Sequence, residues 1–222
     1  MLTERLLEYS LMGAEWVLWL LVALSLVSFA VVIDRVLLYL RTREQMSTLE
    51  PALLEAMTRC DLHAAKQAVQ RDSLVGNVLR AGLEAVEKGR PDIAAAEQAM
   101  LGAMARERDR FEARLPLLGT VGNNAPFIGL FGTVLGIIQA FHQLGQLDAT
   151  SAASNQIVMG AISEALIATG VGIAVAIPAV VAFNWGKSTV ASRIKNAEAL
   201  MRVMLAGMGK LACRDESVGK QG

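Results

Sequence analysis

The sequence predicts an all-α membrane protein with three transmembrane helices and long cytoplasmic helical extensions. Of its 222 residues 54% are hydrophobic, and these are concentrated in particular stretches. Three windows, at residues 16–33, 115–147 and 165–186, contain no Asp, Glu, Lys or Arg. Each window is long enough to cross the roughly 30 Å hydrocarbon core of a bilayer as a helix. The mean hydropathy of +0.42 therefore reflects membrane spans, which excludes a water-soluble enzyme.

Charge and cysteine content exclude further classes of protein. The 21 basic and 21 acidic side chains leave no net positive field that would attract nucleic acid. The two cysteines, Cys60 and Cys213, are too few and too far apart for a disulfide scaffold. Because the sequence has no CxxC motif and no Cys/His pairing, we expect neither a metal site nor a cofactor.

Basic residues predict the orientation, because Lys and Arg near the ends of spans stay on the cytoplasmic side. Arg and Lys follow the first span, precede the second and follow the third, whereas residues 142–163 contain neither. We therefore expect both cysteines in the cytoplasm. The predicted segments are a periplasmic N-terminus (1–15), a first span (16–40), a cytoplasmic loop (41–114), a second span (115–142), a periplasmic loop (143–158), a third span (159–186) and a cytoplasmic extension with a tail (187–222).

A cleaved signal peptide is the competing interpretation of the first span. Ser28-Phe29-Ala30 resembles a cleavage site. However, the residues before the span are mainly acidic, and apolar sequence continues through Ile33. A retained transmembrane helix is therefore favoured.

The cytoplasmic loop has a helical pattern. Asp61 and Ser73 are candidate N-caps, and Pro91 suits the first turn of a further helix. After Ser73, one helix face carries only apolar residues, Leu74, Val78, Leu79, Leu83 and Val86. No strong breaker follows Asp92 before Pro116, so we expect one helix over 92–142, about 75 Å long at 1.5 Å per residue.

The third span is also predicted to continue beyond the membrane. A stripe spaced by four and three residues follows it, made of Val190, Ile194, Ala197, Met201, Met204, Met208 and Leu211. Such a stripe is typical of ordinary helix packing.

Small residues recur in the second and third spans. Gly132 and Gly136 form a GxxxG motif with Gly129 nearby, and Gly172 lies in a similar series with Gly160, Ala168 and Ala176. Small residues mark faces where membrane helices pack closely. Pro126 and Pro178 each remove one helical hydrogen bond, which is tolerated where neighbouring groups or water satisfy the freed carbonyl.

Two threonines are the candidate polar groups within the spans. Thr133 lies nine residues before His142 and Thr169 five residues after Glu164, so antiparallel helices place both hydroxyls at similar depth. Each hydroxyl can bond to a carbonyl one turn earlier. Alternatively the pair, with Glu164, lines a hydrated path. Glu164 itself is either an acid at the level of the lipid headgroups or a group inside the protein.

No Asp, Glu, Lys or His lies in the middle of any predicted span. This chain alone therefore has no group at that depth that could bind and release a proton. If it conducts protons, the titrating carboxylate must belong to another polypeptide.

Two motifs resemble the MotA/TolQ/ExbB proton-channel proteins of bacterial inner membranes. They are Ala125-Pro-Phe-Ile-Gly-Leu-Phe-Gly-Thr-Val-Leu-Gly-Ile137 and Glu164-Ala-Leu-Ile-Ala-Thr-Gly-Val-Gly-Ile-Ala-Val-Ala-Ile-Pro-Ala-Val180. The resemblance covers roughly residues 15–208. Asn123 and Asn124 depart from the small or apolar residues expected before the Ala-Pro step, and their role stays open.

The resemblance implies a homopentamer whose second and third spans line a central pore. A single-span ExbD- or TolR-like partner would sit in the pore and supply the intramembrane aspartate, and a TonB- or TolA-like protein would receive the work. Thr133, Thr169 and Glu164 match the family's functional positions. Whether the motor serves TonB-dependent uptake, Tol-Pal maintenance or motility stays open, as does coupling to protons or sodium.

Two alternatives belong to other functional classes. A passive membrane scaffold would show the same packing by glycine and alanine without ion flow. An intramembrane enzyme is disfavoured, because the spans contain no Ser/His pair, paired aspartates or His/Glu metal grouping.

Overall fold

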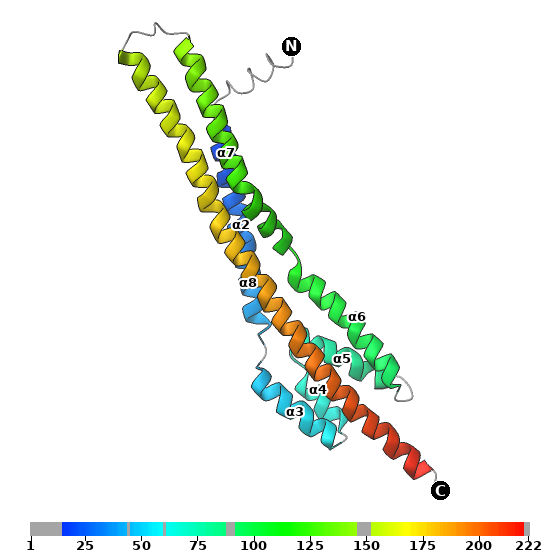
Figure 1. The fold of residues 1–222 in the computed structure, drawn as a ribbon. Coiled ribbons are helices and arrows are strands. Elements are labelled where there is room, and N and C mark those ends of the chain that lie inside the picture. Colours follow the sequence, from blue (N-terminus) through cyan, green and yellow to red (C-terminus); the bar gives the residue numbers. More distant parts are fainter. Residues whose placement is uncertain (1–14, 44, 60, 88–91, 146–151, 220–222) are drawn as a thin grey trace. The chain divides into compact units, whose positions relative to one another are not determined.

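The computed structural model describes residues 15–43, 45–59, 61–87, 92–145 and 152–219 (Figure 1). These residues form α2 (Glu15–Arg41), α3 (Met46–Thr58), α4 (Leu62–Ala68), α5 (Leu74–Glu87), α6 (Ile93–Glu112), α7 (Leu115–Gly145) and α8 (Ala152–Gly219). No strand occurs within the described ranges, and the all-α class is confirmed.

Three helical segments are long and apolar enough to cross a membrane, as the sequence predicts. They are α2, α7 and residues Val158–Gly209 of α8. Most of the predicted N-terminal segment and residues 146–151 of the predicted periplasmic loop lie outside the described part of the chain.

The chain folds as two compact units. The first unit contains α2 up to Asp34, α7, and α8 up to Trp185. The second unit contains α2 from Arg35, helices α3 to α6, and α8 from Gly186.

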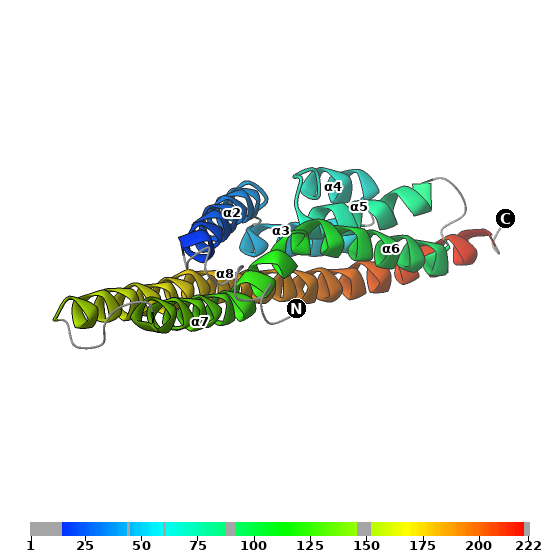
Figure 2. The same cartoon turned by 90° about the horizontal axis from the view of Figure 1, so that it is seen from above.

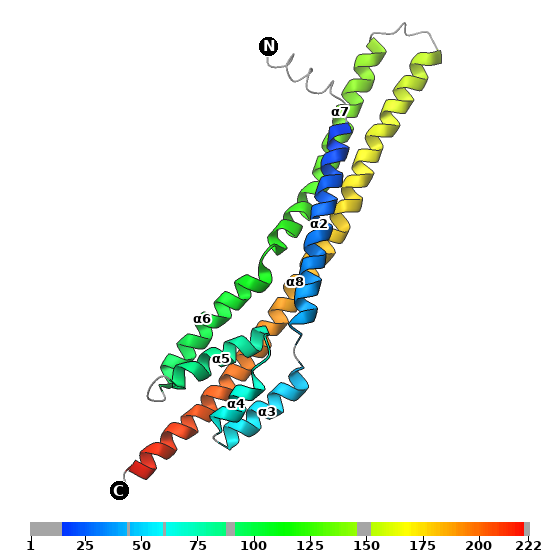
Figure 3. The same cartoon turned by 180° about the vertical axis from the view of Figure 1, so that it is seen from behind.

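Within the first unit, α7 and α8 lie side by side in every view (Figures 1, 2 and 3). The first unit has a core of small and medium apolar residues from α2, α7 and α8: Val17, Leu21, Val121, Ala125, Leu135, Ala176 and Ala179. Its exterior carries many large apolar side chains, among them Trp19, Phe127 and Leu166, each more than half exposed. Such a surface suits lipid or further protein, not water.

The second unit has a conventional helical core. The apolar face of α5 is buried in it as predicted, and so is the α8 stripe from Val190 to Met208, with Ile194 packed against the core. Both predicted N-caps, Asp61 and Ser73, are confirmed. Asp61 accepts from the backbone N–H of His63 at 2.9 Å, and Ser73 Oγ accepts from the backbone N–H of Gly76 at 2.9 Å. Pro91 lies outside the described residues, and Asp92 caps α6.

The expected continuous helix over residues 92–142 is wrong. α6 ends at Glu112, and α7 begins at Leu115. Arg114 between them has φ +65°, a left-handed conformation that is usual at helix C-termini but uncommon for a residue other than glycine. Pro116 explains the break, because its ring would clash with the carbonyl of Glu112 in an unbroken helix.

Side chains of α2 satisfy the carbonyls left open at the end of α6. Arg35 Nη1 donates to the carbonyl of Arg110 at 3.1 Å, and the Tyr39 hydroxyl donates to that of Phe111 at 3.1 Å. The Tyr39 and Phe111 rings also stack, with centroids 6.0 Å apart. The last carbonyls of a helix need such partners when they are buried.

The end of α2 is capped in turn by α8. Arg193 Nη2 donates to the Tyr39 carbonyl at 2.7 Å, and Nη1 donates to Thr42 Oγ1 at 2.8 Å. Its guanidinium lies 5.4 Å from the centroid of the Tyr39 ring and 5.2 Å from that of Phe111. A cation near a helix C-terminus also interacts favourably with the helix dipole. Arg193 therefore fixes α2, α6 and α8 to one another within the second unit.

An ion pair on the same helices is expected to make stability depend on pH. Lys187 Nζ donates to Glu112 Oε2 at 2.6 Å, and this bond, followed by one from Arg108, lowers the pKa of Glu112 from its usual 4.5. A lowered carboxyl pKa adds stability above the unfolded value, and this stability is lost as pH falls through the folded value.

We expect Glu112→Gln to lower stability at pH 7 by less than about 1 kcal/mol, since solvent screens the pair. The difference from the unmodified protein should disappear on acidification below the folded pKa of Glu112. Thermal unfolding in detergent across this pH range measures the effect. Glu55→Gln, which breaks the more exposed Glu55–Arg59 pair, is the control. A deficit for Glu112→Gln that persists in acid would contradict the ion-pair explanation.

Candidate functional site

The candidate site lies where the backbones of α7 and α8 approach each other closely in the first unit. A Cβ atom added to Gly129 would lie 2.6 Å from the carbonyl oxygen of Ala168 and 3.2 Å from the Cα of Gly172. A Cβ atom added to Gly172 would lie 2.6 Å from the carbonyl oxygen of Ala125. Both neighbours are backbone atoms, so the two helices could only accept a side chain here by separating.

The other predicted packing glycines extend this contact along α7. A Cβ atom added to Gly132 would lie 2.8 Å from the Cβ atom of Ala168, and one added to Gly136 would lie 2.5 Å from the Cβ atom of Ala165. Gly160, in contrast, has nothing within 4 Å of its Cβ position. The glycine motif of α7 therefore packs against the alanines of α8, as small residues do in membrane helices.

Thr133 and Thr169 meet at this crossing. The two hydroxyls are hydrogen-bonded to each other, and both lie within reach of the Gly129 carbonyl, at 3.3 Å from Thr133 Oγ1 and 3.2 Å from Thr169 Oγ1. Thr133 Oγ1 also lies 3.4 Å from the Ala165 carbonyl. The prediction that the two hydroxyls lie at one depth is confirmed.

The bond that Thr133 makes to Gly129, four residues earlier, is the ordinary back-bond of a helical threonine. Thr169 instead donates across to α7. Each hydroxyl carries one hydrogen, so the pair has two hydrogens for three kinds of bond: the bond between the hydroxyls, a bond to the Gly129 carbonyl and a bond to the Ala165 carbonyl. The pair can therefore adopt more than one donor arrangement without moving the helices.

Glu164 is not part of this cluster. It is exposed, whereas its neighbour Ala165 is fully buried on the side of α8 that faces α7. Five residues separate Glu164 from Thr169, which places them about 140° apart around the helix. Within one chain, Glu164 therefore points away from the hydroxyl pair.

Polar side chains also occupy an exposed face of α7. Thr120 donates to the Pro116 carbonyl at 2.9 Å, and Asn124 Nδ2 donates to the Thr120 carbonyl at 2.7 Å. Asn123 is exposed as well. Both helices continue through Pro126 and Pro178, of which Pro126 is partly buried and Pro178 exposed.

Two groups that contribute to the site were not predicted from the sequence: the Gly129 carbonyl and Gly122. The Gly129 carbonyl, which both hydroxyls reach, has no side-chain signature. Gly122 packs tightly as well, since a Cβ there would lie 2.4 Å from Val180 Cγ2. The spacing of small residues at 122, 125, 129, 132 and 136 is the signal that could have identified Gly122. Among the described residues, no group of three His, Cys, Asp or Glu side chains gathers as a metal site would require.

A sequence profile described as the MotA/TolQ/ExbB proton channel family matches residues 70–199, which is more than half of the chain. The chain is 35% identical over 182 residues to the Tol-Pal system protein TolQ of Haemophilus influenzae, covering 77% of each chain. It is 41% identical over 121 residues to TolQ of Pseudomonas aeruginosa, covering 51% of each. It is also 47% identical over 89 residues to the biopolymer transport protein ExbB of Xanthomonas campestris, covering 40% of this chain and 34% of that protein. The matches thus span from about a third to about three quarters of these relatives.

The close contact at the α7–α8 crossing predicts that alanine substitutions at two nearby glycines have different effects on stability. Gly172→Ala is expected to destabilise the protein by about 1–3 kcal/mol, because the added carbon meets backbone atoms. Gly170→Ala, with open space at its Cβ position, is expected to be neutral or to stabilise α8 by up to about 1 kcal/mol. Thermal unfolding in detergent measures both. Equal stability of the two variants would show that the helices do not touch at Gly172.

Proposed function

Because this chain belongs to the MotA/TolQ/ExbB proton channel family, we propose that it is the channel-forming subunit of a motor that converts proton motive force into mechanical work at the cell envelope. It is a multi-pass protein of the inner membrane, as its family and its three apolar helices indicate. The basic residues flanking the spans favour a periplasmic N-terminus and a cytoplasmic C-terminus. The relatives are named for the Tol-Pal system and for biopolymer transport, so either process is compatible with the proposal.

The hydroxyl pair at the α7–α8 crossing is the observation that carries this proposal. Hydroxyls in a membrane span are costly unless they face a partner or a hydrated path. Thr133 and Thr169 are hydrogen-bonded to each other and lie within reach of the Ala165 and Gly129 carbonyls, yet both remain partly exposed. They can therefore orient water or a partner's carboxyl group, although they cannot themselves titrate near neutral pH.

The titrating group comes from a second polypeptide in this proposal. Because the spans have no Asp, Glu, Lys or His at mid-depth, an ExbD- or TolR-like single-span partner supplies an aspartate within a homo-oligomer, a pentamer by family resemblance. A TonB- or TolA-like protein receives the motion. Each elementary charge that crosses 100 mV supplies about 2.3 kcal/mol, which is enough to bias a conformational step. The chain then acts through ion flow and assembly, without enzymatic chemistry.

We expect the double variant Thr133→Val/Thr169→Val to lose at least about tenfold in partner-dependent proton flux, because removing hydrogen bonds worth about 1 kcal/mol each raises the barrier. Valine preserves the shape of threonine, so assembly should survive. Proton uptake by liposomes that contain the chain and its partner measures the flux. Thr120→Val, which removes an exposed back-bonded hydroxyl of the same helix, is the matched control. Unchanged flux in the double variant would favour the passive scaffold.

Glu164 is expected to contribute as an exposed acid near the outer end of the third span. Glu164→Gln should lower flux several-fold, whereas Glu15→Gln, at the exposed start of α2, should leave it unchanged. Both variants remove one negative charge, so the comparison separates position from net charge. Equal effects would reduce Glu164 to an acid at the level of the lipid headgroups.

A further inference from the structure

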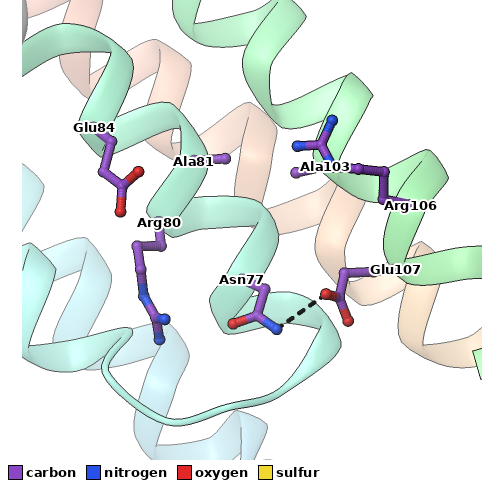
Figure 4. A pocket seen from close by; sticks show the side chains of 7 residues that line it. All are labelled: Asn77, Arg80, Ala81, Glu84, Ala103, Arg106 and Glu107. Atoms are coloured by element: carbon purple, nitrogen blue, oxygen red, sulfur yellow. Dashed lines mark hydrogen bonds between the residues drawn. The ribbon is translucent and has the colours of Figure 1, made fainter. Parts of the chain in front are cut away.

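A groove runs between α5 and α6 on the surface of the second unit (Figure 4). It consists of two adjoining cavities of about 170 Å³ and 360 Å³, which share Ala81, Glu84 and Arg106 as lining residues. Small residues from both helices line its length: Ala81, Ala85, Ala99, Gly102 and Ala103. The groove can therefore accept a bulky apolar side chain from outside.

Two charges at the groove have no counterpart. Glu107 bonds to Asn77 and Arg110, and Arg80 donates to the carbonyls of Val69 and Gln70. Glu84, on the α5 side in Figure 4, and Arg106, on the α6 side, make no ion pair with any residue that the structure describes. An occupant with an acidic group near its apolar side chain would supply the ion-pair partner that Arg106 lacks.

Such a combination exists on α3 of the same chain. Leu54 is 43% exposed, although most large apolar residues of the second unit are buried. Glu50, one turn before Leu54, is exposed and has no described partner. Within the second unit, α3 and α6 lie on opposite flanks in Figures 1 and 3, α3 beside α4 and α6 beside α5. One chain therefore cannot place its own Leu54 in its own groove.

We propose that α3 of one copy docks in the α5–α6 groove of a neighbouring copy, with Leu54 over the alanine floor and Glu50 facing Arg106. This inference rests on the homo-oligomer of the proposed function. A contact between two different surfaces of identical chains repeats head to tail and closes into a ring when the rotation permits. The complementary charges set the register of the contact.

Cysteine cross-linking in membranes tests the contact in the full chain. In a background with Cys60→Ser and Cys213→Ser, Leu54→Cys is combined with Gly102→Cys. Position 102 has room for a side chain, because its Cβ would meet only Arg106 Nη1, at 3.5 Å. Oxidation should give a ladder of covalent multimers with the double variant and none with either single variant. Leu54→Cys with Glu97→Cys, an exposed position of α6 outside the groove, is the matched control and should not form a ladder.

Charge reversal supplies a second readout. Arg106→Glu should lower the cross-linking yield about tenfold through repulsion of Glu50, and adding Glu50→Arg should restore it. A mass measurement of the uncross-linked complex separates the possible failures. An oligomer that forms no ladder would overturn the α3 contact and leave the proposed function standing, whereas a monomer would overturn both. A link from Gly102→Cys to another polypeptide, or a disulfide within one chain, would also overturn the inference.

Discussion

Contact between the backbones of α7 and α8 at Gly129 and Gly172 determines how closely these two helices of the first unit can approach. Lipid offers little hydrophobic drive between helices, so association depends on close packing and on hydrogen bonds across the interface. Gly129 contributes to both, because its missing side chain admits the Gly172 backbone and its carbonyl accepts from Thr169 at 3.2 Å. Any side chain at this crossing would separate the helices and break the bond as well. Packing and polar chemistry are thus coupled at one residue.

The second unit is stabilised in a different way. In two of its helices, α6 and α2, carbonyls of the last turn are satisfied by long side chains from other helices. Arg35 and Tyr39 donate hydrogen bonds to carbonyls at the end of α6, and Arg193 donates one to a carbonyl at the end of α2. These bonds join residues that are 72 to 154 positions apart in the sequence. Removing one partner would leave a buried carbonyl unpaired, which costs about 1–3 kcal/mol.

Periodic features were predictable from the sequence, whereas features that depend on the backbone were not. The spans, the buried face of α5, the α8 stripe and the shared depth of Thr133 and Thr169 follow from spacing, because a helix maps spacing directly onto a face. The break before α7 was missed because the left-handed residue is Arg114 and no glycine marks it. The acceptor role of Gly129 was missed because a carbonyl leaves no trace in the residue type. For Glu164, the spacing alone did not show which way the side chain points around α8.

Oxidation of the buried methionines would disrupt the core of the second unit. Met57, Met100, Met104, Met201, Met204 and Met208 all lie in its core. Met100 and Met204 fill the space beside Gly82, where even a single added carbon would lie 2.7 Å from their atoms. A sulfoxide oxygen there would be a polar acceptor without a donor in a space that is already full. An oxidant could therefore reach these methionines only when the core opens transiently. Once a thioether is oxidised, its sulfoxide would hinder repacking of the core.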